Sequence, residues 1–177
     1  MNAKHTLRNY ERLAPDALRI ERTLDAPIDT VWRWLTDPEL RRQWFASGTD
    51  ASREGELDLV FDHDELSADY VPYPPEFEKH RGAVSHERVL KSEPPHLLVW
   101  SWAGGKEGTV TFELSAQGRQ TRLVLTHRGI SGPPANDSFS TGWLAHLAVL
   151  EAKLSGRTVA DFWALVREYK AALTAAS

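Results

Sequence analysis

The segment S-F-S-T-G-W-L-A-H-L-A-V-L-E-A-K-L-S-G-R, which runs from Ser138 to Arg157, decides the fold of this chain. Large apolar residues recur along it at spacings of four, three and four, which places them on one stripe of a helix. These residues are Trp143, Leu147, Leu150 and Leu154. A helix of this extent is roughly 25 Å long, so it can lie across a whole sheet.

Both ends of this helix have recognisable signals. Three polar residues near its start are candidate N-caps, because their side-chain oxygens can accept hydrogen bonds from the first turn. They are Asp137, Ser138 and Ser140. Gly156 stands where a helix C-terminus favours a left-handed residue. We therefore expect the helix to end close to Arg157.

Almost every segment before this helix has the pattern of a β-strand. Apolar and polar residues alternate in six stretches, which are residues 18–24, 57–63, 82–91, 96–102, 108–115 and 121–128. Turn-forming residues separate several of them, for example at 93–96 and 117–118. We predict an α+β fold in which a curved antiparallel sheet of about six strands wraps around the long C-terminal helix.

Two short helices are predicted after the first strand. Pro27 suits a first helical position, and an apolar face follows it at Ile28, Val31, Trp32 and Leu35. Asp37 ends this helix, because a residue before proline avoids the helical region. Asp37 then caps a second helix from Pro38 to Trp44.

The chain divides into three parts, which are a polar lead-in over residues 1–16, a main domain over 17–157 and an amphipathic C-terminal helix over 158–177. Thr158 is the predicted cap of that last helix, because Asp161 follows it in the acidic form of a capping box. Within the main domain, residues 62–79 are an acidic insertion whose prolines exclude a central strand. We expect a surface loop more mobile than the strands, either solvated or folded as a lid over a cavity mouth.

Composition narrows the class of protein. Apolar residues make up 41% of the 177 residues and charged residues 26%, as in ordinary globular domains. The net charge is −4 with scattered basic residues, so we expect no nucleic-acid partner. No apolar run approaches the ~18 residues of a membrane span, and no signal peptide is visible, so we expect a cytoplasmic protein. Without cysteine there is no disulfide and no thiol nucleophile.

Several segments, in order, resemble the activator-of-Hsp90-ATPase-homologue family, the bacterial branch of the SRPBCC (START/Bet v 1-like) superfamily. They are residues 20–27, 31–32, 35–38, 43–45, 93–102, 110–114, 121–123 and 142–144. The resemblance covers roughly residues 18–155. It implies a helix-grip fold, in which an antiparallel sheet curves around a long helix and encloses an apolar cavity.

The resemblance implies less about activity than about fold. Members bind or process diverse hydrophobic ligands, and no universal catalytic residues can be carried over. The family takes its name from eukaryotic co-chaperones that have a separate N-terminal Hsp90-binding domain. Nothing in this chain is long enough to be that domain, so we do not expect Hsp90 activation.

Residues on the inward faces of the predicted strands and helices are candidates for the cavity wall. They are Trp32, Phe61, His63, Leu98, Trp100, Trp102, Val110, Phe112, Leu123, Leu125, His127, Trp143, Leu147 and Leu150. Among them are four of the seven tryptophans of the chain. Trp100, Trp102 and Trp143 are compatible with an aromatic box for a planar ligand and equally with a simple core.

Two histidines continue otherwise apolar strand faces and are the catalytic candidates. His63 follows Phe61 and His127 follows Leu125, so both should point at the long helix and stay neutral near pH 7. The alternative is that each marks the rim where its strand leaves the core. The carboxylates beside His63 do not predict a metal site, because alternate strand residues point to opposite faces.

The sequence favours a protein that binds an unidentified small hydrophobic or aromatic ligand in an apolar cavity. One alternative is an enzyme of the cyclase/aromatase or hydrolase kind that uses His63 or His127. Another is a co-chaperone-like interaction module, which would have a filled cavity and an exposed apolar patch. We expect no cofactor, no metal and no membrane partner, and retain a homodimer as one option.

Overall fold

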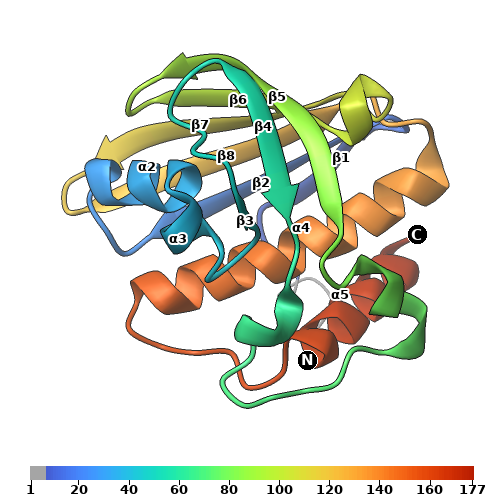
Figure 1. Ribbon diagram of the computed structural model, residues 1–177. Helices are drawn as coiled ribbons and strands as arrows, with labels where there is room; N and C mark the ends of the chain where they lie inside the picture. Colours follow the sequence, from blue (N-terminus) through green and yellow to red (C-terminus); the bar gives the residue numbers. More distant parts are fainter. Residues whose placement is uncertain (1–6) are drawn as a thin grey trace.

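The computed structural model describes residues 7–177, which form one antiparallel sheet with helices on its concave side (Figure 1). The sheet has eight strands in the order β1-β2-β8-β7-β6-β5-β4-β3. They are β1 Tyr10–Ala14, β2 Ala17–Leu24, β3 Ser47–Gly48, β4 Gly55–Val60, β5 Val84–Glu93, β6 Leu97–Ser101, β7 Thr109–Gln117 and β8 Gln120–Arg128. The predicted α+β class and curved antiparallel sheet are confirmed, with eight strands instead of about six.

The two strands without a sequence prediction, β1 and β3, lie at the edges of the sheet. In β1 only Tyr10, Leu13 and Ala14 are half-buried, so no regular alternation develops. β3 has two residues, and at Gly48 the backbone φ is +107°. A Cβ there would lie 2.0 Å from the carbonyl oxygen of Asp58 on β4, so the close strand approach requires glycine.

The remaining elements are α2 Ile28–Thr36, α3 Pro38–Arg41, η1 His63–Glu65, η2 Pro75–His80, η3 Ala103–Gly105, α4 Pro133–Leu154 and α5 Phe162–Ala176. Asp37 ends α2 as predicted, and its carboxylate caps α3 by accepting from the Glu39 N–H at 2.9 Å. α3 ends at Arg41 and not at Trp44, because the chain turns there to carry Trp44 into the core.

The long helix α4 begins five residues before the predicted start. Its N-cap is Gly132, with prolines in the first turn, so the three predicted caps are wrong. The C-terminal prediction is confirmed, because Gly156 has a φ of +72°. The Gly156 N–H donates to Lys153 and the Arg157 N–H donates to Ala152, which is the hydrogen-bond pattern of a Schellman motif.

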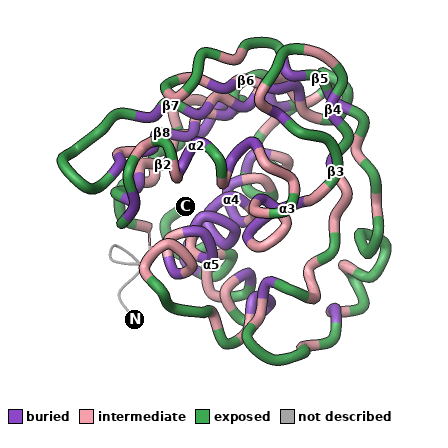
Figure 2. Tube along the Cα trace, turned by 60° about the vertical axis from the view of Figure 1, so that its left-hand side comes forward, coloured by how far each residue is buried: buried purple, intermediate pink, exposed green. Residues whose placement is uncertain are grey.

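α4 lies across the sheet and is buried on two sides (Figure 2). The predicted stripe faces the sheet, whereas Leu144, Ala145 and Val149 are buried in addition. The extra burial arises because α5 packs against α4 on the side away from the sheet (Figure 1). α5 starts at Phe162 with Asp161 as its cap, which accepts from the Ala164 N–H at 3.0 Å. The observed cap therefore lies three residues, or about one turn, after the predicted cap at Thr158.

The 62–79 insertion is fastened to the start of α5. Leu66 and Tyr73 are 1% and 6% exposed, and the Phe162 N–H donates to the Ser67 hydroxyl oxygen at 2.9 Å. The Trp163 ring contacts Tyr73 and Phe77, with ring centroids 4.9 and 5.1 Å away. The segment thus runs over the surface, as expected of a loop, but it is held by its own buried side chains.

Asn136 in the first turn of α4 ties the helix to the first two strands. Its side-chain amide, which is fully buried, donates to the carbonyl oxygens of Ala14, Pro15 and Ala17 at 3.1–3.2 Å. Its carbonyl oxygen accepts from Ser140 at 3.1 Å. This network therefore fixes the N-terminal turn of α4 to the turn between β1 and β2 at the edge of the sheet.

Within residues 7–177, no helix combines the length and the apolar character needed to cross a bilayer.

Candidate functional site

The loop after α3 brings two aromatic side chains under the sheet. Arg41 organises this loop, because its buried guanidinium donates to the carbonyl oxygens of Ala46, Ser47 and Thr49 at 2.7–3.1 Å. Phe45 then lies at the centre of the interior, with its ring 5.1 Å from that of Trp143 and 6.2 Å from that of Trp100. The loop therefore occupies space that would otherwise lie open between the sheet and α4.

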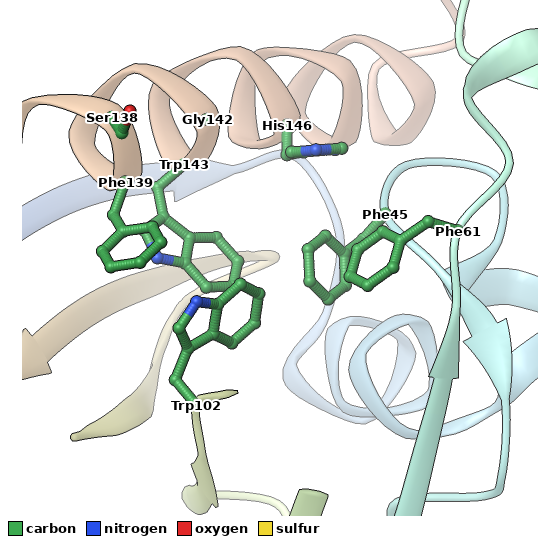
Figure 3. Close-up of a pocket in the computed structure, with 8 residues that line it drawn as sticks. All are labelled: Phe45, Phe61, Trp102, Ser138, Phe139, Gly142, Trp143 and His146. Carbon is green, nitrogen blue, oxygen red and sulfur yellow. The ribbon is translucent and has the colours of Figure 1, made fainter. Parts of the chain in front are cut away.

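A pocket of about 100 Å³ remains beside Phe45 (Figure 3). Its lining residues are Phe45, Phe61, Trp102, Ser138, Phe139, Gly142, Trp143 and His146. In Figure 3, Trp102 and Trp143 form one side and Phe45 and Phe61 the other, with α4 above them. Ser138 is exposed, so the pocket reaches solvent near the N-terminal half of α4. The surface of the pocket is almost entirely aromatic.

Three of the fourteen predicted cavity residues line this pocket, namely Phe61, Trp102 and Trp143. Eight others are fully buried in the packed core, which are Leu98, Trp100, Val110, Phe112, Leu123, Leu125, Leu147 and Leu150. The prediction that these eight residues line the cavity needs correction, because a side chain with no accessible surface borders no open space. Trp32 is 8% exposed on α2. The inward direction of these residues was predictable, but the filling of the space by Trp44 and Phe45 was not.

His127 lies next to the pocket, but both of its ring nitrogens are engaged. Its Nε2–H donates to the carbonyl oxygen of Glu107 at 2.8 Å, and its Nδ1 accepts from the Trp143 indole N–H at 3.2 Å. Burial lowers the pKa of His127 below its ordinary value. The neutral imidazole thus links the turn after β6 to α4 through these two hydrogen bonds. The bond to the indole N–H also orients the Trp143 ring.

His63 is placed by Tyr73 of the insertion. β4 ends at Val60 and His63 lies in η1 beyond the strand. Its ring nevertheless stacks on that of Phe61 at 6.2 Å and lies 5.5 Å from that of His146 on α4, as the alternation predicted. Its backbone N–H donates to the Tyr73 hydroxyl oxygen at 2.7 Å, and its Nδ1 is 2.8 Å from the same oxygen. Because that oxygen already accepts from the backbone, the Tyr73 O–H is placed to donate to Nδ1. Burial, reinforced by nearby His146 and His80, lowers the pKa of His63 to about 3.

His146 is the functional candidate that strand patterns do not reveal. It lies on α4 and lines the pocket, with Phe45 5.1 Å and His63 5.5 Å away between ring centroids. Its Nδ1–H donates to the Trp44 carbonyl oxygen at 2.8 Å. Its other nitrogen, Nε2, has no hydrogen-bond partner within the described part of the chain. The signal available in the sequence was its spacing of three residues from Trp143, on the same helix face.

The protonation state of His146 determines what the pocket can do. Burial lowers the pKa of His146 to about 4, against the rise caused by its bond to Trp44. At neutral pH the ring carries one proton, which Nδ1 needs for its bond to the carbonyl, so Nε2 presents a lone pair. The pocket therefore combines aromatic walls with the Nε2 acceptor of His146 in its interior and the Ser138 hydroxyl at its exposed side.

We expect stability to depend on His146 between about pH 4 and pH 6.5. In this range an unfolded histidine binds a proton that the folded ring excludes, so acidification favours the unfolded chain. The contribution is present above pH 6.5 and is lost as the pH falls, by up to about 1.4 kcal/mol per pH unit. Urea unfolding at several pH values gives the free energy of unfolding as a function of pH. Its slope in this range should be smaller in His146→Gln than in the unsubstituted protein, by the equivalent of about one bound proton. Equal slopes in the two proteins would contradict the burial of a neutral ring.

Among residues 7–177, no three histidine, aspartate or glutamate side chains are grouped so as to hold a metal ion.

Solved structures share this architecture. A protein encoded by gene BPP1335 of Bordetella parapertussis is 36% identical, with a TM-score of 0.77 over 91% of this chain and 86% of that one. CalU16 from Micromonospora echinospora is 25% identical, with a TM-score of 0.62 over 93% of this chain and 92% of that one. DynU16, from the dynemicin biosynthetic locus, is 22% identical with a TM-score of 0.58, over 82% of this chain and 49% of that one. The last likeness concerns the fold alone.

No curated protein sequence matches the chain. A family model does match, and it spans residues 25–155, from the end of β2 to the end of α4. That range includes the pocket and all three histidines discussed above. The chain belongs to the activator of Hsp90 ATPase homolog 1-like protein family.

Proposed function

We propose that this protein binds a small, mostly apolar ligand whose ring lies in the aromatic pocket and whose single hydrogen-bond donor meets Nε2 of His146. The family fold is compatible with ligand binding. The observation that carries the proposal is Gly142, in the middle of α4.

Gly142 lowers the stability of α4 and leaves open space in the pocket. Glycine inside a helix is less favourable than alanine by about 1 kcal/mol. A Cβ at Gly142 would meet nothing within 4 Å, so no crowding requires glycine there. The missing side chain instead leaves space beside Trp143, and Gly142 lines the pocket. A local cost without a packing reason is typical of a site kept open for a ligand.

The dimensions of the pocket limit the ligand. Its volume of about 100 Å³ is below the roughly 150 Å³ of an apolar cavity that accepts benzene. A single ring fits once the side chains at the mouth adjust. The faces of Trp102 and Trp143 favour a flat, apolar ring. A hydroxyl or N–H group on the ring would satisfy the Nε2 lone pair of His146.

Binding fits the chemistry better than catalysis does. A general base works best when its pKa lies near the operating pH, and the pKa of His146 is about 4. His127 has both nitrogens in hydrogen bonds, so it has no free position for proton transfer. An interaction module would present a continuous apolar patch, but the large exposed apolar side chains of residues 7–177 are only Tyr70, Val84 and Leu90.

Substitution of Gly142 should change stability and binding in opposite directions. Gly142→Ala should raise the free energy of unfolding by about 0.5–1 kcal/mol through helix propensity, while it weakens binding of phenol. Gly142→Leu should fill the pocket and weaken phenol binding by at least about tenfold, which corresponds to about 1.4 kcal/mol. Calorimetry or amide shifts would give the dissociation constants, with urea unfolding for stability.

Toluene is the matched control ligand, because it has the same ring without the donor. It should bind more weakly than phenol to the unsubstituted protein, and His146→Phe should remove the difference. Phenol binding that is saturable and unaffected by Gly142→Leu would place the site elsewhere and overturn the proposal.

A further inference from the structure

Two histidines at the aromatic pocket, His63 and His146, present opposite hydrogen-bonding groups. The Nδ1–H of His146 donates to the Trp44 carbonyl oxygen at 2.8 Å, so its Nε2 carries a lone pair. His63 has the reverse arrangement, because its Nδ1 accepts from the Tyr73 O–H at 2.8 Å. A neutral imidazole carries one proton, which in His63 therefore lies on Nε2. One ring thus offers an acceptor and the other a donor.

The two rings are close enough to bind one ligand atom together. Their centroids are 5.5 Å apart, with an angle of 46° between the ring planes. Two hydrogen bonds of about 2.9 Å that meet at a single oxygen span a similar distance. The Nδ1 of His63 faces Tyr73, so its Nε2, on the other side of the imidazole, points away from that residue. The donor and the acceptor are therefore available to the same ligand group.

Neither Nε2 atom is sealed inside the protein. Within residues 7–177, the fully buried side-chain nitrogen and oxygen atoms that lack a hydrogen-bond partner are Asp64 Oδ1 and Trp100 Nε1. The two Nε2 atoms also lack a partner there but are not among these, so each keeps some accessible surface. His146 lines the aromatic pocket, and the His63 ring stacks on Phe61, another lining residue, at 6.2 Å. The pair therefore borders the pocket from α4 and from η1.

The charge state of the pair limits the ligand group. Burial lowers the pKa of His63 to about 3 and that of His146 to about 4, so both rings are neutral at pH 7. A carboxylate only accepts hydrogen bonds, so it would face the lone pair of His146 without a counter-charge. An amine N–H satisfies His146 but leaves the His63 donor unpaired. A hydroxyl satisfies both, because its oxygen donates one hydrogen bond and accepts another.

We propose that His63 and His146 together recognise a hydroxyl group, so that the ligand is a phenol or an aromatic alcohol and not an aryl amine or an aryl acid. The hydroxyl donates to Nε2 of His146 and accepts from Nε2–H of His63. Tyr73 is a positioning residue, because its O–H fixes the tautomer of His63. This inference rests on the proposed function, which places the ring of the ligand in the aromatic pocket.

The two tautomers are tested without any ligand. Two-bond ¹H–¹⁵N correlation spectra near neutral pH should show His63 protonated at Nε2 and His146 protonated at Nδ1. Tyr73→Phe keeps the ring that packs on Trp163 but removes the hydroxyl. In this variant the His63 nitrogens should shift toward a mixture of tautomers, whereas those of His146 should not. A proton on Nδ1 of His63 in the unsubstituted protein would overturn the inference.

Phenol and aniline test the recognition itself, because they have the same ring and both donate to His146. The aniline nitrogen is a poor acceptor, since its lone pair is delocalised into the ring. Phenol should bind at least about fivefold more tightly than aniline, as one additional hydrogen bond allows. The O–H is also the stronger donor, so the contribution of His63 is the change in this ratio. By calorimetry, His63→Phe should lower the ratio at least about threefold.

Two further variants are the controls. His63→Gln keeps an N–H donor near the position of Nε2 and should retain most of the phenol preference, which separates the lost hydrogen bond from a folding defect. His86→Phe removes a histidine whose side chain is 79% exposed on β5, and it should leave the ratio unchanged.

The outcomes separate this inference from the proposed function. Phenol binding that is lost in Gly142→Leu, with the same phenol-to-aniline ratio in His63→Phe as in the unsubstituted protein, would overturn hydroxyl recognition alone. Absence of phenol binding to the unsubstituted protein would overturn both.

Discussion

Replacement of Arg41 by methionine is expected to lower the free energy of unfolding by about 3 kcal/mol or more. The Arg41 side chain is fully buried and donates to carbonyl oxygens of the loop over residues 46–49 and of the C-terminus of α2. Burial lowers its pKa to about 10, so it stays charged at neutral pH. Methionine fills similar volume but leaves these acceptors unpaired, at about 1–3 kcal/mol for each group that water cannot reach.

Arg42→Met is the matched control, because the adjacent side chain is 42% exposed and pairs with carboxylates at the surface. Exposed ion pairs contribute about 0–1 kcal/mol, so this variant should unfold nearly as the parent does. Urea unfolding monitored by circular dichroism measures both. If the free energies of unfolding of Arg41→Met and Arg42→Met differed by less than about 1 kcal/mol, the stability of the loop would not depend on the buried guanidinium.

Trp163→Ala is expected to destabilise the protein by about 3–5 kcal/mol, the usual range for a buried tryptophan. The Trp163 side chain, which is 4% exposed, packs against Tyr73, Phe77 and His63 of the 62–79 insertion and its flank. Its loss removes three aromatic contacts between that segment and α5. Amide exchange across residues 63–80 should therefore accelerate more than exchange in β7 and β8.

Tyr70→Ala provides the comparison within the same segment, because Tyr70 is 68% exposed. A surface substitution of this kind should change stability by about 0.5 kcal/mol or less. Uniform acceleration of exchange in every element of Trp163→Ala would show that the insertion has no separate dependence on this contact.

The elements that could be predicted from sequence are those whose residues repeat a regular spacing. The stripe from Trp143 to Leu154 and the alternation in β7 and β8 follow from helix and strand geometry, so the fold was accessible. β1 lies at an exposed edge and β3 is too short for alternation, which explains the two missing strands. The start of α4 was missed because its first turn has prolines and no side-chain cap.

The site was less accessible, because non-repeating contacts define it. Strand alternation placed His127 inward, but not the Glu107 carbonyl and Trp143 indole that occupy its nitrogens. Alternation also gave the direction of His63, but not the Tyr73 hydroxyl that lies 2.8 Å from its Nδ1. His146 depends on the carbonyl of Trp44, a residue 102 positions away along the chain. Such partners follow only from the tertiary arrangement of a loop.

The β2–β8 pairing has a consequence for how the chain folds. β2 finds its partner about a hundred residues later, where Ile20 faces Leu125, and Asn136 reaches back over 119–122 residues to the first hairpin. During synthesis the β2 edge therefore stays unpaired until β8, which ends at Arg128, has emerged. Contacts of such sequence separation close loops at a high entropic cost, so folding in the millisecond-to-second range is expected. The nascent N-terminal half would be the state most prone to aggregation.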